Sequence, residues 1–231
     1  MSVLSWRRNG RPDDIVRLLS RIGFVVVLFL VALALLSVAI RFVRTIDVLL
    51  HGANHPASSG PFESRYEAHP YLTLIHVVAG FFFMITGPVQ FVESIRRRRP
   101  WWHRLSGRIF IVSGVVCAVS ALMFVAVLPI FGSFSSSVAV SLGSILFLIA
   151  IARAYVLIRR RQVRKHREWM IRAFALGLGI ATFRLLLPIL NSPLIGASFM
   201  EAWDTVTWLG FSINLLVAEA WIGFTRDHSS S

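Results

Sequence analysis

Two segments, RRRRPWWHRLSGRIF (residues 96–110) and RRRQVRKHREWMIRA (residues 159–173), follow the same order: a run of arginines, a His-Arg pair and the start of an apolar stretch. They lie 63 residues apart, and His103 in the first matches His166 in the second. Deeper in the apolar stretches, Gly114 matches Gly177. Internal repeats of this kind are frequent in membrane folds. We therefore interpret the two segments as the entrances to related hairpins.

The composition around these segments is that of a membrane protein. Of 231 residues, 56% are hydrophobic and 15% are charged, and the mean hydropathy is +0.70. A soluble domain carries about 25% charged residues. Six apolar stretches reach or approach the roughly 20 residues that a helix needs to cross a bilayer. We place them at residues 22–42, 71–92, 107–130, 137–158, 169–190 and 205–225.

Lipid offers no hydrogen bonds to the backbone, so these spans are expected to be helices. The sequence predicts an all-α, polytopic membrane protein with six transmembrane helices. Its single membrane domain is expected to occupy residues 1–231, with a four-helix core formed by spans two to five.

The basic residues predict the orientation of the spans. Of the 24 lysines and arginines, 19 fall on one side, in the N-terminal segment, in the loops after spans two and four, and in the tail. Cytoplasmic loops carry such an excess, so we expect a bacterial inner-membrane protein with both termini in the cytoplasm. The net charge of +13 then reflects topology and contact with anionic lipid. Nucleic acid is not needed as a partner.

The longest connection, residues 43–70, is expected on the outer side. Its glycine, proline and serine content predicts irregular structure. It contains His51, His55 and His69, whose spacing fits no specific zinc pattern, so we interpret them as residues of a solvated loop. The single cysteine, Cys117, excludes an intramolecular disulfide framework.

Three histidines each begin a stripe of small residues. Positions 4, 7, 11, 15 and 18 after a residue return to nearly the same face of a helix. From His103 this face carries Gly107, Phe110, Gly114, Ala118 and Ala121; from His166 it carries Met170, Ala173, Gly177, Ala181 and Arg184; after His76 come Gly80 and Gly87. Such stripes allow close helix packing. They also suit a flat macrocycle whose iron is ligated by histidine. Both interpretations stay open.

Ionisable residues inside the spans form a second group of candidates, because charge in hydrocarbon is costly and is usually paired or functional. Arg184 lies on the same stripe as His166 but near the outer side, where His76 is also expected. There it is a candidate to bind a propionate, a quinone oxygen or a carboxylate; Glu201 and Asp204 are alternative partners. In the inner half of the membrane, Arg153 and Glu219 are expected to form a structural charge pair.

Three segments, HPYLTLIHVVAGFFFMITGPVQF (69–91), HRLSGRIF (103–110) and HREWMIRAFALGLGIATFR (166–184), resemble a bacterial membrane family catalogued as domain of unknown function 2306. The resemblance covers residues 65–190, which we take as the core. It implies the topology and no established activity.

A weaker, architectural likeness is to cytochrome b561, in which histidine pairs on central helices two with four and three with five hold two b haems. His103 and His166 occupy the three-five positions. The fourth span carries no histidine opposite His76, so the likeness implies at most one bis-histidine haem site.

Two functions of different class follow from these patterns. In the first, the protein transfers electrons with haem b or a quinone, and exchanges them with a redox partner. His103 and His166 would ligate the haem iron, and His76 and Arg184 would contact the cofactor. In the second, it is a non-redox membrane protein, either a small-solute transporter or a binding or assembly protein. Pro88, Pro129 and Pro188 favour the second weakly, since interrupted helices are typical of transporters.

Overall fold

The structure is a computed structural model that describes residues 12–52, 63–127 and 133–227, and these residues form helices and no strand. The helices are α1 (Pro12–His51), α2 (Glu63–Ala68), α3 (Pro70–Phe91), α4 (Glu93–Arg98), α5 (Pro100–Val127), α6 (Phe134–Arg159), α7 (Val163–Gly177), α8 (Gly179–Leu190) and α9 (Phe199–Asp227). Six spans are long and apolar enough to cross a membrane, with α7 and α8 together forming the fifth. The predicted all-α, six-span fold is confirmed.

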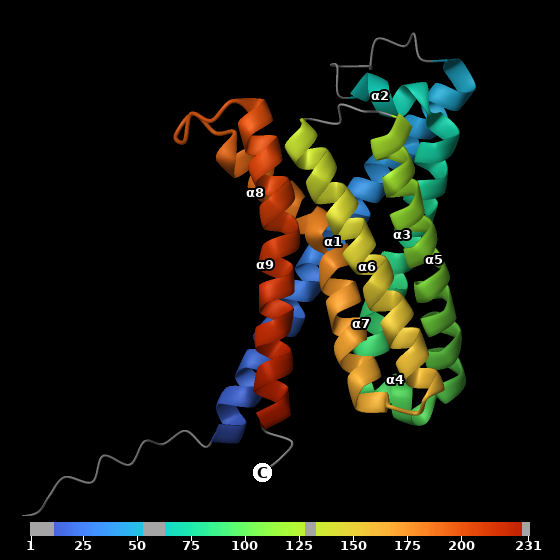
Figure 1. The fold of residues 1–231 in the computed structure, drawn as a ribbon, viewed down its shortest axis with the longest axis vertical. Coiled ribbons are helices and arrows are strands. Elements are labelled where there is room, and N and C mark those ends of the chain that lie inside the picture. Colours follow the sequence, from blue (N-terminus) through green and yellow to red (C-terminus); the bar gives the residue numbers. More distant parts are fainter. Residues whose placement is uncertain (1–11, 53–62, 128–132, 228–231) are drawn as a thin grey trace, which may run out of the picture.

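The spans run alternately up and down (Figure 1). The start of α1, the turn that contains α4, the connection from α6 to α7 and the end of α9 lie at one end of the bundle. This end carries the arginine runs 96–99 and 159–161. The basic residues are thus gathered at one end, as the sequence predicts. That this end faces the cytoplasm of a bacterial inner membrane stays a prediction.

The helix bounds differ most from expectation in the outer connection. The first helix continues to His51 instead of ending at residue 42, so the prediction of irregular structure throughout residues 43–70 was wrong. A hydrogen bond of 2.9 Å between Asp47 and His51, one turn apart, supports the added length. Residues 63–68 form the short helix α2. His55 lies outside the described residues.

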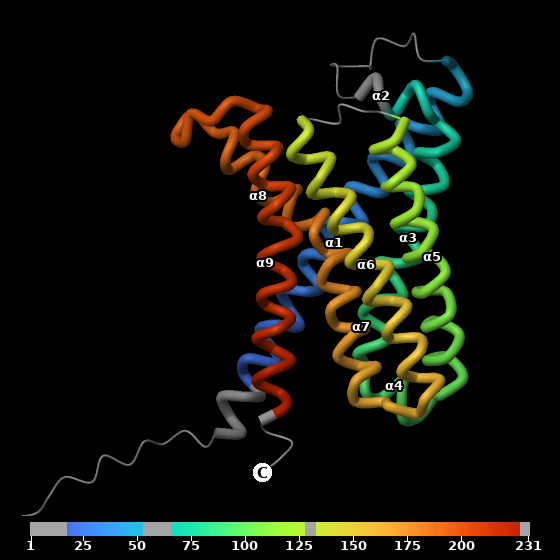
Figure 2. The backbone as a smooth tube through the Cα atoms, viewed as in Figure 1, coloured from blue at the N-terminus to red at the C-terminus, as the bar shows by residue number. Residues whose placement is uncertain are grey.

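The fifth span is interrupted at Leu178, between α7 and α8, and the backbone can be followed through this point in Figure 2. Two glycines, Gly177 and Gly179, flank the interruption, and glycine is a poor helix former. Hydrogen bonding resumes when the N–H groups of Ala181 and Thr182 both donate to the carbonyl of Leu178. Gly179 and Ile180 are the first residues of α8.

The core between spans two and five is built on phenylalanine rings. Phe83 of α3 stacks on Phe110 of α5 at 4.5 Å between ring centroids, and meets Phe147 of α6 edge-on at 5.4 Å. Phe174 of α7 lies 6.0 Å from Phe83. All four rings are buried. Because these contacts join α3, α5, α6 and α7, they hold together the four-helix core that the sequence predicts.

The start of α6 is fixed by a capping box at Ser133. Its Oγ accepts hydrogen bonds from the N–H groups of Ser135 and Ser136, and it donates to a carboxylate oxygen of Asp204 on α9. One side chain therefore caps α6 and ties it to the last span.

We expect Ser133→Ala to lower the free energy of unfolding by about 1 kcal/mol, the usual cost of a lost cap. Thermal unfolding of the detergent-solubilised protein measures this loss. Thr225→Ala is the control, because the Thr225 hydroxyl bonds only to carbonyls of its own helix. Equal stability of the two variants would contradict the proposed role of the cap.

Candidate ligand-binding cavity

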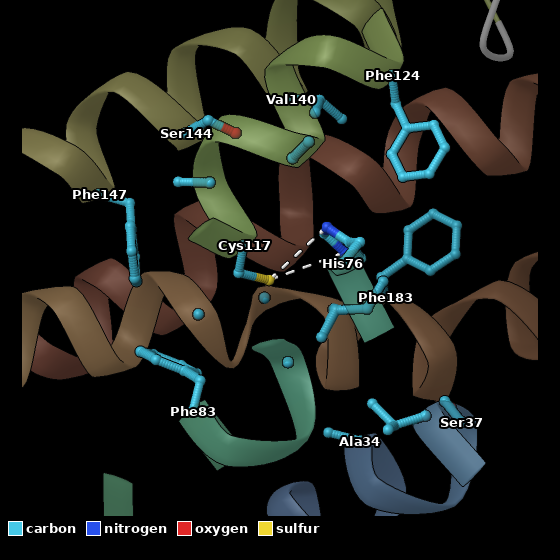
Figure 3. A pocket seen from close by; sticks show the side chains of 18 of the residues that line it. Ala34, Ser37, His76, Phe83, Cys117, Phe124, Val140, Ser144, Phe147 and Phe183 are labelled. Carbon is cyan, nitrogen blue, oxygen red and sulfur yellow. Dashed lines mark hydrogen bonds between the residues drawn. The ribbon is translucent and has the colours of Figure 1, made fainter. Parts of the chain in front are cut away.

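A cavity of about 280 Å³ lies between the spans, and residues of all six spans line it. Its walls are mostly apolar and rich in aromatic rings, among them Phe83, Phe124, Phe147, Phe183, Trp203 and Phe211. Figure 3 shows several of these side chains around His76. Among the described residues that line the cavity there are two arginines and no aspartate or glutamate. The site suits a small apolar molecule that carries a polar group.

His76 of α3 is one of the polar groups in this wall, and its hydrogen bonds define its tautomer. Its Nδ1 lies 2.9 Å from Oγ of Ser120. The hydroxyl of Ser120 lies 2.7 Å from the carbonyl oxygen of Val116, one turn earlier on α5, and must donate its only hydrogen there because a carbonyl accepts. Ser120 therefore accepts from His76, and Nδ1 carries the proton. Nε2 of the neutral ring is left as an acceptor.

Cys117, one turn before Ala121 on α5, lies next to the same ring. Its Sγ is 3.8 Å from Nδ1 and 3.8 Å from Nε2 of His76, as the dashed lines in Figure 3 mark. Equal distances to the two nitrogens place the sulfur in the plane midway between them, off the lone-pair axis of Nε2. The thiol is a weak donor in any case. It therefore leaves the Nε2 lone pair accessible to a better donor.

Arg184 of α8 lines the same cavity, so His76 and Arg184, which the sequence places at similar depth, contribute to one site. Its guanidinium lies 5.8 Å from the ring centre of Phe183. The carboxylates expected to pair with Arg184 bind hydroxyl groups: Glu201 accepts from Ser198, and Asp204 accepts from Ser133.

The interruption of the fifth span lies in this wall, because Gly179 and Ile180 at the start of α8 line the cavity. The guanidinium of Arg184 carries hydrogen-bond donors, whereas Nε2 of His76 is an acceptor.

His103 and His166 lie elsewhere, in the first turns of α5 and α7 at the arginine-rich end of the bundle. That the two rings face one another stays a prediction. His166 donates from Nδ1 to the carbonyl of Ala154 at 2.8 Å, which leaves its Nε2 as an acceptor. Nδ1 of His103 is buried and makes no hydrogen bond within the described part of the chain. Neither residue lines the cavity.

The small residues of the histidine stripes test whether a haem fits between these helices. A Cβ on Gly177 would lie 2.3 Å from the ring of Phe83, and one on Gly114 would lie 3.0 Å from the ring of Phe147. Next to His103, a Cβ on Gly107 would meet the side chain of Gln90 at 3.1 Å. Side chains of neighbouring helices therefore fill the places that a macrocycle would need. The packing does not fit the predicted haem site, and it favours helix packing as the role of the stripes.

The predicted charge pair is replaced by a different one. Glu219 accepts two hydrogen bonds from Arg172 of α7, at 2.5 and 2.8 Å. The guanidinium of Arg153 instead lies over the ring of Trp169 at 5.4 Å. A pairing of Glu168 with Arg226, which sequence reasoning missed, adds a second clamp between α7 and α9. A sequence signal exists for Glu168, which lies within the arginine-rich segment 159–172.

Three features of the cavity also escaped sequence reasoning. Cys117 was treated only as a residue that excludes disulfides, although its position seven residues before Phe124 places both on the cavity wall. The interruption at Leu178 had a signal in the sequence, the Gly-Leu-Gly at 177–179. The contributions of α1 and α9 to the cavity wall had no signal in the sequence, because they depend on how these spans cross the core. Among the described residues, no cluster of three or more histidine, cysteine or acidic side chains is arranged to hold a metal ion.

Fold and cavity together define a polytopic all-α membrane protein with a site inside its helix bundle. Comparison with protein families matches residues 73–222 to the predicted membrane protein family DUF2306. The chain belongs to this family. The match includes most of the sixth span and so extends beyond the predicted core of residues 65–190. Comparisons with curated proteins and with solved structures found no match, and none of these findings supports the likeness to cytochrome b561.

Proposed function

We propose that this membrane protein binds a small, mostly apolar molecule with a polar head group in the cavity between its spans. One observation carries this proposal: a volume of about 280 Å³ that all six spans line, with His76 and Arg184 among its few polar groups. An engineered apolar cavity of about 150 Å³ is large enough to bind benzene. A substituted ring or a short chain is therefore within the capacity of this site.

Transport of the same molecule is a second candidate, and the interruption of the fifth span favours it. Substrate sites of many transporters lie near the middle of the membrane, next to helices that are broken there. The interruption at Leu178 adjoins the cavity through Gly177 and Gly179. Electron transfer through a haem held by His103 and His166 has no comparable support. Neither a quinone nor a redox partner has such support.

Filling the cavity tests the proposal. Ala121 lines it and is partly buried, so Ala121→Phe places a ring inside the binding volume. We expect this variant to lose at least one small molecule that the unaltered protein retains through purification. Mass spectrometry of organic extracts from the purified proteins measures the loss.

Ala152→Phe is the matched control, because Ala152 is exposed on α6 and does not line the cavity. It should retain the same molecules as the unaltered protein. Identical extracts from all three proteins would contradict the proposal.

A further inference from the structure

The hydrogen bonds of His76 restrict what can bind beside it. Because Nδ1 donates to Ser120, the ring meets the cavity with a lone pair on Nε2 and not with an N–H group. An acceptor such as a ketone or quinone oxygen has nothing to bind there. A hydroxyl group can donate a hydrogen bond to this lone pair.

This tautomer is held in place by three atoms on α5 and not by the ligand. The Ser120 hydroxyl lies 2.7 Å from the carbonyl oxygen of Val116 and 2.9 Å from that of Cys117. If the Ser120 hydrogen turned towards His76, two oxygens would face each other at 2.7 Å without a hydrogen between them, which is repulsive. The acceptor character of Nε2 is therefore a property of the unliganded site.

The surroundings of His76 favour a ring as the body of the ligand. Phe124 meets the imidazole edge-on, with 5.7 Å between ring centres. Phe83, Phe147, Phe183 and Phe211 form further parts of the wall. Aromatic rings in such walls contact another ring edge-to-face or offset, which adds to the gain from burial. The volume of about 280 Å³ accommodates a benzene ring with several substituents.

We propose that the cavity selects a ring hydroxyl, an inference that rests on the proposed binding function. Its ligand is then a phenol or quinol and not the corresponding quinone or hydrocarbon. The hydroxyl donates to Nε2 of His76. Other oxygen atoms on the ring accept from Arg184. The site binds the molecule in one orientation, with its hydroxyl towards α3 and α5.

Two redox-inert probes of equal size test this selection. 2,3,5-Trimethylphenol carries a hydroxyl where 1,2,3,5-tetramethylbenzene carries a methyl group. Equilibrium dialysis against the full chain in nanodiscs, corrected with empty nanodiscs, gives the two dissociation constants. We expect the phenol to bind about tenfold more tightly than the hydrocarbon, since the hydrocarbon leaves Nε2 with no donor but the weak thiol of Cys117. Partition into lipid favours the hydrocarbon, so the preference cannot arise from the bilayer.

Variants assign the preference to His76. His76→Phe should bind both probes equally, while His166→Phe, at the other end of the bundle, should keep the tenfold preference. Equal binding of the two probes by the unaltered protein, or a preference that survives in His76→Phe, would overturn the hydroxyl inference and leave cavity binding intact. If neither probe binds above the empty nanodiscs, the proposed binding function fails as well. The probe comparison on the unaltered chain does not depend on how well a variant folds.

Discussion

Gly210→Ala is expected to lower the free energy of unfolding by about 2 kcal/mol, within the range for overpacked cores. Gly210 lies where α9 crosses the start of α8. A Cβ there would stand 2.7 Å from the carbonyl oxygen of Gly179 and 3.6 Å from the backbone nitrogen of Phe183. These are backbone atoms, so no side chain can turn away to make room. The two helices would have to separate.

Gly223→Ala is the control on the same helix, because a Cβ at Gly223 meets nothing within 4 Å. Both substitutions replace glycine in a helix by a better helix former, a gain of about 1 kcal/mol, so their difference isolates the crossing. Thermal or denaturant unfolding in detergent measures it. Equal stability of the two variants would mean that α8 and α9 do not pack this closely.

The same substitution links packing to the candidate site. Gly179 lines the cavity and is also the residue on which Gly210 packs. Moving α9 away from α8 would displace Phe211, whose ring lies within 3.0 Å of a Cβ built on Gly179. We therefore expect Gly210→Ala to weaken ligand binding as well as stability. The contact between Gly210 and Gly179 thus stabilises the fold and also shapes the cavity.

How much of this structure could be predicted from the sequence depends on the kind of signal. Span number and helical class follow from hydropathy, which is a property of each segment alone. The common end of the arginine runs follows from alternation of the spans. The position of His103 and His166 at the same end of the bundle follows from the repeat, since equivalent positions of two parallel spans lie at the same depth.

Properties that depend on neighbours could not be predicted in this way. Glu219 was assigned to Arg153 by depth, but Arg172 lies at a comparable depth on a helix that packs against α9, and only the packing distinguishes the two. The same holds for the glycine stripes. A sequence identifies the helix face that carries small residues, but not whether a phenylalanine ring or a cofactor packs against that face. Here the rings of Phe83 and Phe174 pack against it.

The cavity is a third case, because it is defined by what is missing between helices. Arg184 is singled out in the sequence as a charge in apolar surroundings, and such residues are functional candidates by default; His76 is singled out as the third histidine that begins a small-residue stripe. That they line one volume depends on the crossing of α1, α8 and α9 over the core, which no local pattern encodes. Polar residues in the spans were therefore the better guide to the site, and the repeated histidines were the weaker one.

Glu168→Met is expected to destabilise the protein by about 2 kcal/mol, because it removes the carboxylate that joins α7 to α9. The Glu168 side chain is 11% exposed and is bound by Arg226 through both guanidinium nitrogens Nε and Nη2. Arg164 and Arg172 are also close enough to interact with it. Breaking a fully buried pair costs about 3–5 kcal/mol. The smaller value reflects Arg226, whose side chain is 48% exposed and stays partly hydrated.

Two further variants separate the ion pair from the loss of volume. Glu93→Met breaks the pair of Glu93 with Arg97, whose side chains are 60% and 77% exposed, and should change stability by less than about 0.5 kcal/mol. The double variant Glu168→Met with Arg226→Met should recover most of the loss, since a buried pair replaced on both sides by apolar groups is often neutral. With the single variant Arg226→Met added, unfolding of these proteins in one detergent completes a double-mutant cycle. If Glu168→Met were no more destabilising than Glu93→Met, this ion pair would contribute no more than an exposed one. The last span would then be held to α7 by its other contacts, among them the pair of Arg172 with Glu219.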